Sequence, residues 1–426
     1  MLSTLKDAWK IPEIRRKMIF TLFMLFIFRL GSNVPVPYMD KQIIQDIFSR
    51  QEGGLLQFLD LMAGGTFSNF SIFATNIYPY ITASIIIQLL TIAFPSLEEL
   101  AKEGEEGRKK IARYTKYTAL VLATIQALGM TLGLFSPALV AETALQKFIV
   151  VITLVAGTSF LMWIGERITE KGVGNGTSLI IFIGIVSRFP VEVVNTFRLL
   201  KAGLISPFTV VLFAIIFLVI IAFVVALQEG ERKIPVQYAK RVVGRKMYGG
   251  QSTHIPIKVS MAGVMPVIFT SSILAIPQTI AMLAGENSGA AQWISKWLTP
   301  QGNIGIWVYT IFNILLIMFF TYFYTAIQFN TVEYSKNLQQ NGGFIPGIRP
   351  GKPTSEYLDK IVSRITFVGG LSLAILASLP IVLSKIFNMN VSFGGTAVII
   401  VVGVALETVK QLESQMLMRH YSGFLK

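Results

Sequence analysis

The chain has 426 residues, of which 53% are hydrophobic and only 14% are charged, a balance far from that of a soluble globular protein. The formal net charge of +14 is compatible with nucleic-acid binding, but in a membrane protein the first question is where the positive charges lie. Cysteine is absent, which excludes disulfides and thiolate chemistry, and the only histidines, His254 and His420, fall in polar segments. We therefore expect no metal and no cofactor.

Long apolar runs recur along the whole chain, and a helix needs about 20 such residues to cross a bilayer. The first run follows basic residues and ends without a small-residue cleavage site, so we interpret it as a retained span rather than a signal peptide. All the runs should be helices, because backbone exposed to lipid must be hydrogen-bonded within its own segment. Ten spans are predicted, at 18–34, 70–94, 115–135, 147–165, 177–195, 207–227, 259–284, 304–328, 365–386 and 393–411.

Lysine and arginine gather in alternate connections between these spans. Most of the 37 basic residues lie in the N-terminus, the C-terminus and loops 95–116, 166–171, 228–258 and 331–364. The positive-inside rule places these segments, and both chain ends, in the cytoplasm. The spans divide five and five around the outer loop 188–206, which predicts an N-terminal half, 1–195, and a C-terminal half, 196–426. An inverted pair of five-helix halves is a common transporter plan.

One apolar segment is too short to span the membrane. "GGLLQFLDLMAGG", 53–65, predicts a helix of about ten residues between two glycine pairs, either re-entrant or lying on the outer surface. Asp60 in its middle argues against deep burial in lipid.

The span interiors hold almost no ionisable residues, which ion-coupled carriers usually need. Glu166 and Glu407 lie at cytoplasmic helix ends, and Arg29 lies near the outer end of the first span, from which it can reach water. No HExxH motif, phosphate-binding loop or cysteine nucleophile is present, so we expect no enzyme. What the spans do contain is isoleucine at helical spacing, such as Ile77 and Ile81. Each of these isoleucines taken alone is compatible with an ordinary lipid-facing side chain.

Six stretches taken together resemble the SecY family, the channel subunits of the general protein-secretion translocon. They occur in the right order along nearly the whole chain: "PYITASIIIQLL" (79–90), "EGEEGRKKIARYTKY" (103–117), "ITEKGVGNGTSLIIF" (168–182), "QSTHIPIKVSMAGVMP" (251–266), "GGFIPGIRPGK" (342–352) and "FGGTAVIIVV" (393–402). The resemblance implies an all-α integral membrane protein of the bacterial inner membrane, with two pseudo-symmetric five-helix halves around a central pore. It implies a channel that moves unfolded secretory polypeptides across the membrane and releases membrane-protein helices sideways into lipid.

The resemblance also implies roles for particular residues. The pore would close at a ring of apolar side chains, with Thr177 where the family usually has an aliphatic residue: Ile77, Ile81, Thr177, Ile181, Ile268 and Ile400. The short helix at about 55–65 would be a plug, with the residues Leu55, Leu56, Phe58, Leu59, Leu61 and Met62. A lateral gate would lie between the helices at 75–94 and 115–135 and those at 259–284 and 304–328, with the residues Pro79, Ile86, Gln88, Pro266, Ser271 and Pro277. Loop 188–206 would be the hinge at the back.

A pore without coupling charges needs an external source of energy. Loops 228–258 and 331–364 are longer than ordinary connections, which favours a docking function over simple retention in the cytoplasm or contact with anionic lipids. Glycine and proline around Phe344 and Ile345 predict that these apolar residues are held in water. The resemblance names ribosomes and the SecA ATPase as docking partners, SecE and SecG as membrane subunits, and secretory and membrane-protein precursors as cargo. Anionic lipids are a further expected partner of the basic segments. The expected docking residues are Arg232, Lys233, Lys240, Arg241, Arg245, Lys246 and Arg349.

Two other classes of protein remain open on the residues alone. A transporter of the inverted-repeat type would need a polar site for one small substrate at the middle of the membrane. A membrane enzyme would need a polar catalytic cluster, which the sequence does not show.

Overall fold

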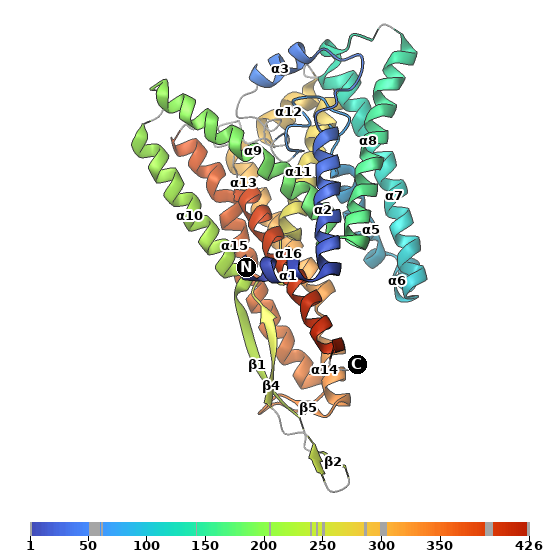
Figure 1. Cartoon of the computed structure of the whole chain (residues 1–426), viewed down its shortest axis with the longest axis vertical. Coiled ribbons are helices and arrows are strands. Elements are labelled where there is room, and N and C mark those ends of the chain that lie inside the picture. Colours follow the sequence, from blue (N-terminus) through green and yellow to red (C-terminus); the bar gives the residue numbers. More distant parts are fainter. Residues whose placement is uncertain are drawn as a thin grey trace.

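The computed structural model describes residues 2–50, 60, 63–141, 143–203, 206–238, 241–243, 246–248, 252–284, 288–298, 305–387 and 395–423. Long helices form the body of the molecule, and a small sheet projects from one end (Figure 1). The helices are α1 (Leu2–Lys10), α2 (Pro12–Gly31), α3 (Lys41–Arg50), α5 (Tyr78–Ala93), α6 (Pro95–Lys102), α7 (Glu105–Leu128), the π-helical segment η1 (Gly129–Leu134), the short η2 (Ser136–Ala138), α8 (Ala144–Lys171), α9 (Gly176–Lys201), α10 (Pro207–Glu229), α11 (Met265–Ala284), α12 (Gly289–Trp297), α13 (Gly305–Gln328), α14 (Thr331–Gln340), α15 (Lys352–Phe387) and α16 (Gly395–Gly423).

Every predicted span overlaps at least one of these helices. Among the described residues, seven helices are long and apolar enough to cross a membrane, and the pair α5–α6 makes an eighth if it counts as one span. The chain bends by 102° between α5 and α6, at Phe94, because the residue before a proline is driven out of the helical conformation. The protein is therefore an all-α membrane protein, while the count of ten spans stays a prediction for α2 and α11.

Two predicted boundaries are wrong. Residues 70–77 form turns rather than helix, with left-handed backbone at Phe70 and Asn76, and they are hydrogen-bonded to the strand-like stretch 34–36. The predicted outer loop 188–206 is helical as far as Lys201, because α9 continues through Pro190. Membrane helices accommodate proline when other groups satisfy the freed carbonyl. The segment 188–201 is therefore a helix rather than a loop, and the role of 188–206 as a hinge stays a prediction.

The long loops 228–258 and 331–364 contain strands that were not predicted from the sequence. β1 (Glu231–Tyr238) pairs antiparallel with β4 (Ser252–Lys258) on one side and with β5 (Gly343–Phe344) on the other. β2 (Arg241–Val243) and β3 (Lys246–Tyr248) form a second hairpin at the tip. Ile234 and Val236 are buried while their neighbours are exposed, the alternation of a strand with one covered face.

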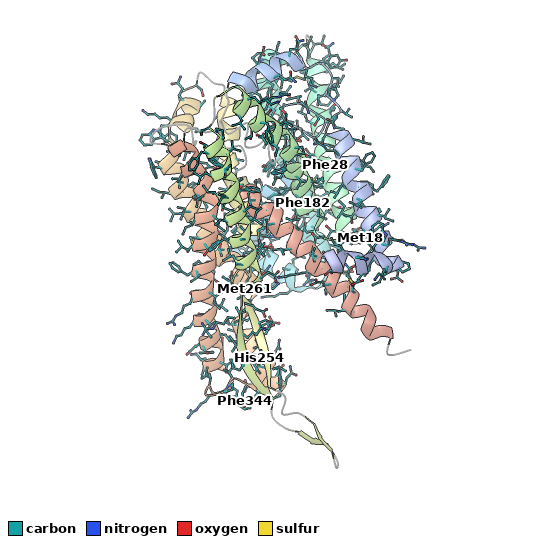
Figure 2. The ribbon with its side chains drawn as sticks, turned by 60° about the vertical axis from the view of Figure 1, so that its left-hand side comes forward. Met18, Phe28, Phe182, His254, Met261 and Phe344 are labelled. Carbon is teal, nitrogen blue, oxygen red and sulfur yellow. The ribbon has the colours of Figure 1, made fainter. Side chains whose placement is uncertain are left out.

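A separate apolar core supports this projection. Ile234 and Val236 from the sheet pack with Leu338 of α14 and Leu358 of α15, and Ile345 joins the same cluster. In Figure 2, Met261 lies where the helical body meets the sheet, and His254 and Phe344 lie farther out. The projection is therefore a packed unit rather than a pair of free loops.

The helices of the body approach closely where glycines face each other. A Cβ on Gly176, in the first turn of α9, would lie 1.9 Å from the carbonyl oxygen of Gly165 on α8. Small residues of this kind let two membrane helices come together.

We expect Gly176→Ala to lower the free energy of unfolding by about 1–3 kcal/mol, because the new methyl group has to displace backbone. Thermal unfolding of the purified protein in detergent measures this change. The control is Gly289→Ala, since a Cβ there meets nothing within 4 Å. Equal stability of the two variants would show that the α8–α9 contact is looser than described.

Candidate functional site

Five isoleucines from four helices meet in the centre of the molecule. Ile77 and Ile81 lie at the start of α5, Ile181 on α9, Ile268 on α11 and Ile400 on α16. All are between 0% and 4% exposed, and all belong to one cluster of buried apolar residues. We call this set, the predicted ring without Thr177, the waist. Residues from both ends of the chain thus fill one constriction.

Thr177 lies beside the waist rather than buried within it. The side chain is half-buried in the first turn of α9, next to Gly176. A Cβ built on Gly165 would be 3.6 Å from the Thr177 nitrogen and 3.7 Å from Cδ1 of Ile77. The close α8–α9 contact therefore places Thr177 next to the apolar residues.

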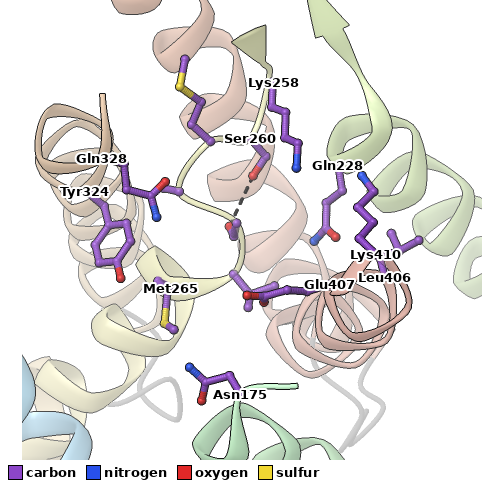
Figure 3. Close-up of a pocket in the computed structure, with 15 residues that line it drawn as sticks. Asn175, Gln228, Lys258, Ser260, Met265, Tyr324, Gln328, Leu406, Glu407 and Lys410 are labelled. Carbon is purple, nitrogen blue, oxygen red and sulfur yellow. Dashed lines mark hydrogen bonds between the residues drawn. The ribbon is translucent and has the colours of Figure 1, made fainter. Parts of the chain in front are cut away.

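A cavity of about 340 Å³ lies next to the waist, on the side of the sheet (Figure 3). Two of its lining residues lie on helices that also carry waist residues. Met265 comes one turn before Ile268 on α11, and Gly403 comes one turn after Ile400 on α16. Asn175 lines it from the start of α9, and its side chain accepts a hydrogen bond from the Ser178 N–H at 3.2 Å. Along α11 and α16, the cavity therefore lies one helical turn from the waist.

The lining of this cavity mixes chemical types. Gln228, Lys258 and Glu407 point into it from one side, and Tyr324 and Gln328 from the other (Figure 3). Lys410, also in the lining, forms an ion pair with Glu229 of α10 at 2.8 Å. A wall with carboxamides, a phenol, methionines and charges of both signs suits many passing side chains better than one small ligand. Among the described residues, no group of three or more acidic or histidine side chains could hold a metal ion.

The predicted lateral-gate residues lie on two helices that touch. Pro79 is buried in the first turn of α5, and Ile86 and Gln88 are half-buried on the same helix. α11 packs against both α5 and η1, so the two sides of the predicted gate are in contact.

The gate residues on α11 are Pro266, Ser271 and Pro277. Pro266 is buried in its first turn and Pro277 lies within the helix. Ser271 donates to the Val267 carbonyl at 2.9 Å. The Ser271 hydroxyl therefore donates its hydrogen bond within α11.

Arg349 is exposed at the end of the projection, in the loop between β5 and α15. Gly347 and Gly351 on either side have φ values of 83° and 94°, a left-handed backbone that favours glycine. The hydroxyl of Thr354 donates to the Arg349 carbonyl at 2.8 Å, and Ser335 of α14 donates to the Gly351 carbonyl at 2.7 Å. The loop therefore presents the arginine in a fixed position.

Other docking residues are only partly placed. Arg232 and Lys233 are exposed on β1, and Lys233 pairs with Glu231 at 3.3 Å. Arg241 and Lys246 lie in β2 and β3. Lys240 and Arg245 lie outside the described residues, as do the six predicted plug residues Leu55, Leu56, Phe58, Leu59, Leu61 and Met62.

The prediction that Phe344 and Ile345 are held in water is wrong. Ile345 is 3% exposed within the core of the projection, and Phe344 is half-buried in β5 opposite Gln237. These apolar residues stabilise the projection, which leaves the charged and turn residues for contact with a partner.

Comparison with known proteins agrees with this architecture. The family model described as SecY matches residues 71–409. The chain is 46% identical to the protein translocase subunit SecY of Halalkalibacterium halodurans and 44% identical to that of Aquifex aeolicus, in both cases over 100% of each chain.

Solved structures show the same fold at low identity. A structure described as a protein-conducting channel matches with a TM-score of 0.67 and 20% identity, over 97% of each chain. Sec61 in the canine ribosome–channel complex matches with a TM-score of 0.63 and 18% identity, also over 97% of each chain. With its full-length matches to bacterial relatives and this fold, the chain belongs to the SecY family.

Proposed function

We propose that this chain is a protein-conducting channel, which translocates unfolded secretory polypeptides and releases membrane-protein helices laterally into the bacterial inner membrane. The observation that carries the proposal is the waist, five buried isoleucines that lie next to a cavity with a mixed lining. An apolar constriction loses its water and so blocks ions without any specific ligand. Isoleucine side chains offer a passing polypeptide no hydrogen bonds, so the constriction accepts any sequence.

Sideways release needs a second opening. We propose the contact between α11 and α5–η1 as the lateral gate, with the prolines of these helices easing their separation. The segment 55–65 is the proposed plug of the outer side. One relative of known structure is described as having a plug domain that stabilises the closed state of the channel.

The projection is the proposed docking surface for the source of energy. Related channels have been solved in complexes with ribosomes, the canine Sec61 channel and the yeast Ssh1 complex. Exposed arginine and lysine side chains would contact ribosomal RNA through its phosphates. SecA would dock on the same surface for transport after synthesis, and SecE and SecG would be the membrane subunits.

The basic residues also indicate which segments lie on the cytoplasmic side of the membrane. We propose that the projection, α6 and both termini lie in the cytoplasm, the side that holds most of the basic residues. Figure 1 has both chain ends toward the end of the molecule that carries the projection. The chain itself would perform no catalysis, because its partners hydrolyse the nucleotides.

A crosslinking experiment tests the proposed path, using the absence of cysteine in the chain. With Ile81→Cys and a cysteine in a precursor stalled halfway by a folded tag, oxidation should give a disulfide-linked product that requires SecA and ATP. The control is Ile92→Cys, on the same helix but 55% exposed. If Ile81→Cys and Ile268→Cys both fail to crosslink while the control is freely alkylated, the polypeptide does not pass here and a small-substrate transporter becomes the better hypothesis.

The waist itself can be tested by making it polar. The double variant Ile81→Ser with Ile268→Ser should raise the ion conductance of channels in planar bilayers roughly tenfold or more, because burial of each isoleucine contributes about 1.5–3 kcal/mol. The matched control is Ile92→Ser with Ile276→Ser, at positions 55% and 40% exposed on the same two helices. Equal conductance in both double variants would remove the waist from the seal.

Arg349→Glu should abolish SecA-driven transport into vesicles and leave folding and insertion unchanged, since the side chain is exposed and only the backbone of the loop is braced. Lys360→Glu is the control, an equal reversal of charge at an exposed position of α15. Normal secretion in the Arg349 variant would contradict the proposed docking role.

A further inference from the structure

A buried carboxylate lies outside the waist, at the other end of the helical body. Asp60 is 1% exposed, and removing a charge from water costs several kcal/mol unless partners replace the lost hydration. Its Oδ2 forms an ion pair with Nη2 of Arg188 on α9. Its Oδ1 accepts from the N–H groups of Phe67 at 3.1 Å and Ser68 at 2.8 Å. Both oxygens of the carboxylate are therefore engaged.

These bonds connect a turn to a helix. The turn Ala63–Ser68 is closed by the Asp60 carboxylate and by a bond from the Gly65 N–H to the Asp60 carbonyl at 2.9 Å. Arg188 joins that closed turn to the part of α9 that lies just before Pro190. Helical structure up to Lys201 gives this arginine a rigid base, which a loop at 188–206 would not provide.

A second arginine also binds the turn. Nη1 of Arg29 on α2 donates to the Gly64 carbonyl at 2.7 Å. Arg29 is half-buried, so its side chain contacts the turn as well as its surroundings. α2 and α9 therefore each contribute one cation that binds the turn.

The packing of the turn leaves no room for it to shift in place. A Cβ on Gly64 would lie 2.7 Å from Cα of Gly184 on α9, and Gly64 has a φ of 70°. A Cβ on Gly65 would lie 3.6 Å from the guanidinium carbon of Arg188. The turn can therefore leave its place only by breaking both arginine contacts.

We infer that Asp60, Arg188 and Arg29 form a charged clamp that keeps the turn Ala63–Ser68 docked against α2 and α9 and so holds the outer side of the channel closed. The inference rests on the proposed function, because Asp60 and the first residues of this turn lie in the proposed plug, 55–65. Arg188 and Asp60 are positioning residues: they hold the turn in its docked position, and the docked turn keeps the channel closed. Their ion pair is the contact that opening has to break.

The first test measures whether the turn stays docked. Ala63→Cys, at a position 1% exposed, is alkylated with a membrane-impermeant maleimide on reconstituted channels without precursor. Arg188→Gln should raise the alkylation rate roughly ten- to hundredfold, because it removes the charged partner of the Asp60 carboxylate. Asp60→Asn should act in the same direction, although its amide oxygen still accepts from Phe67 and Ser68.

Two controls separate a clamp from general loosening. Ala119→Cys, 0% exposed where α7 packs against Ala83 of α5 in an apolar cluster apart from the turn, should stay unreactive in all variants, whereas unfolding would expose it too. Glu170→Gln neutralises the exposed Arg167–Glu170 pair and should leave the alkylation of Ala63→Cys unchanged. Equal rises at Ala63 and Ala119 would make Asp60 and Arg188 ordinary stabilising residues and overturn the clamp.

A double variant tests the coupling of the two charges. Asp60→Asn with Arg188→Gln should raise the alkylation rate by less than the product of the two single effects, since neither change leaves an unpaired charge when the other is present. Multiplicative effects, or wild-type rates in both single variants, would contradict the clamp. The crosslink of a precursor at Ile81→Cys is measured in the same preparations. A retained crosslink with an unaltered turn refutes the clamp alone, and a missing crosslink in the otherwise wild-type chain refutes the channel.

Discussion

Apolar contact among Ile77, Ile81, Ile181, Ile268 and Ile400 is the interaction around which the rest of the molecule is arranged. The five side chains come from four helices, and each is almost fully buried. A contact of this kind has no direction, so it forms whenever the helices close and breaks without the loss of any hydrogen bond. For a proposed pore that admits every kind of side chain, a seal without specific partners is a physical requirement.

The polar groups on the two sides of the waist make different kinds of contact. On the side of the sheet the cavity is lined by Gln228, Gln328 and Glu407, groups that can exchange hydrogen bonds with water or with a polypeptide. On the opposite side the inferred clamp uses directional charge contacts of Asp60 and Arg188, which fix one position of a turn. The apolar contacts of the waist can rearrange around different side chains. The ion pair of the inferred clamp fixes one closed position of the turn.

The projection is stable for a different reason from the helical body. Its sheet and helices enclose their own apolar core around Ile234, Val236 and Ile345, separate from the core of the helical body. Arg349 is held at its end by left-handed glycines and by the hydroxyl of Thr354. A partner that pushes on this surface therefore meets a rigid element attached to α10, α11 and α15.

The sequence by itself determined the membrane class, the helices and the family, because a long apolar run has to be hydrogen-bonded internally in lipid and this leaves little choice of structure. The stretches shared with the family also predicted which isoleucines form the waist. Only the tertiary structure decided where polar residues go, since their partners are distant in the chain. Asp60 meets Arg188, Gly64 meets Arg29 and Gln237 meets Phe344 across long sequence separations. The strand β1 was open to prediction from the alternation at Ile234 and Val236, whereas the burial of Ile345 depended on a core that no local pattern describes.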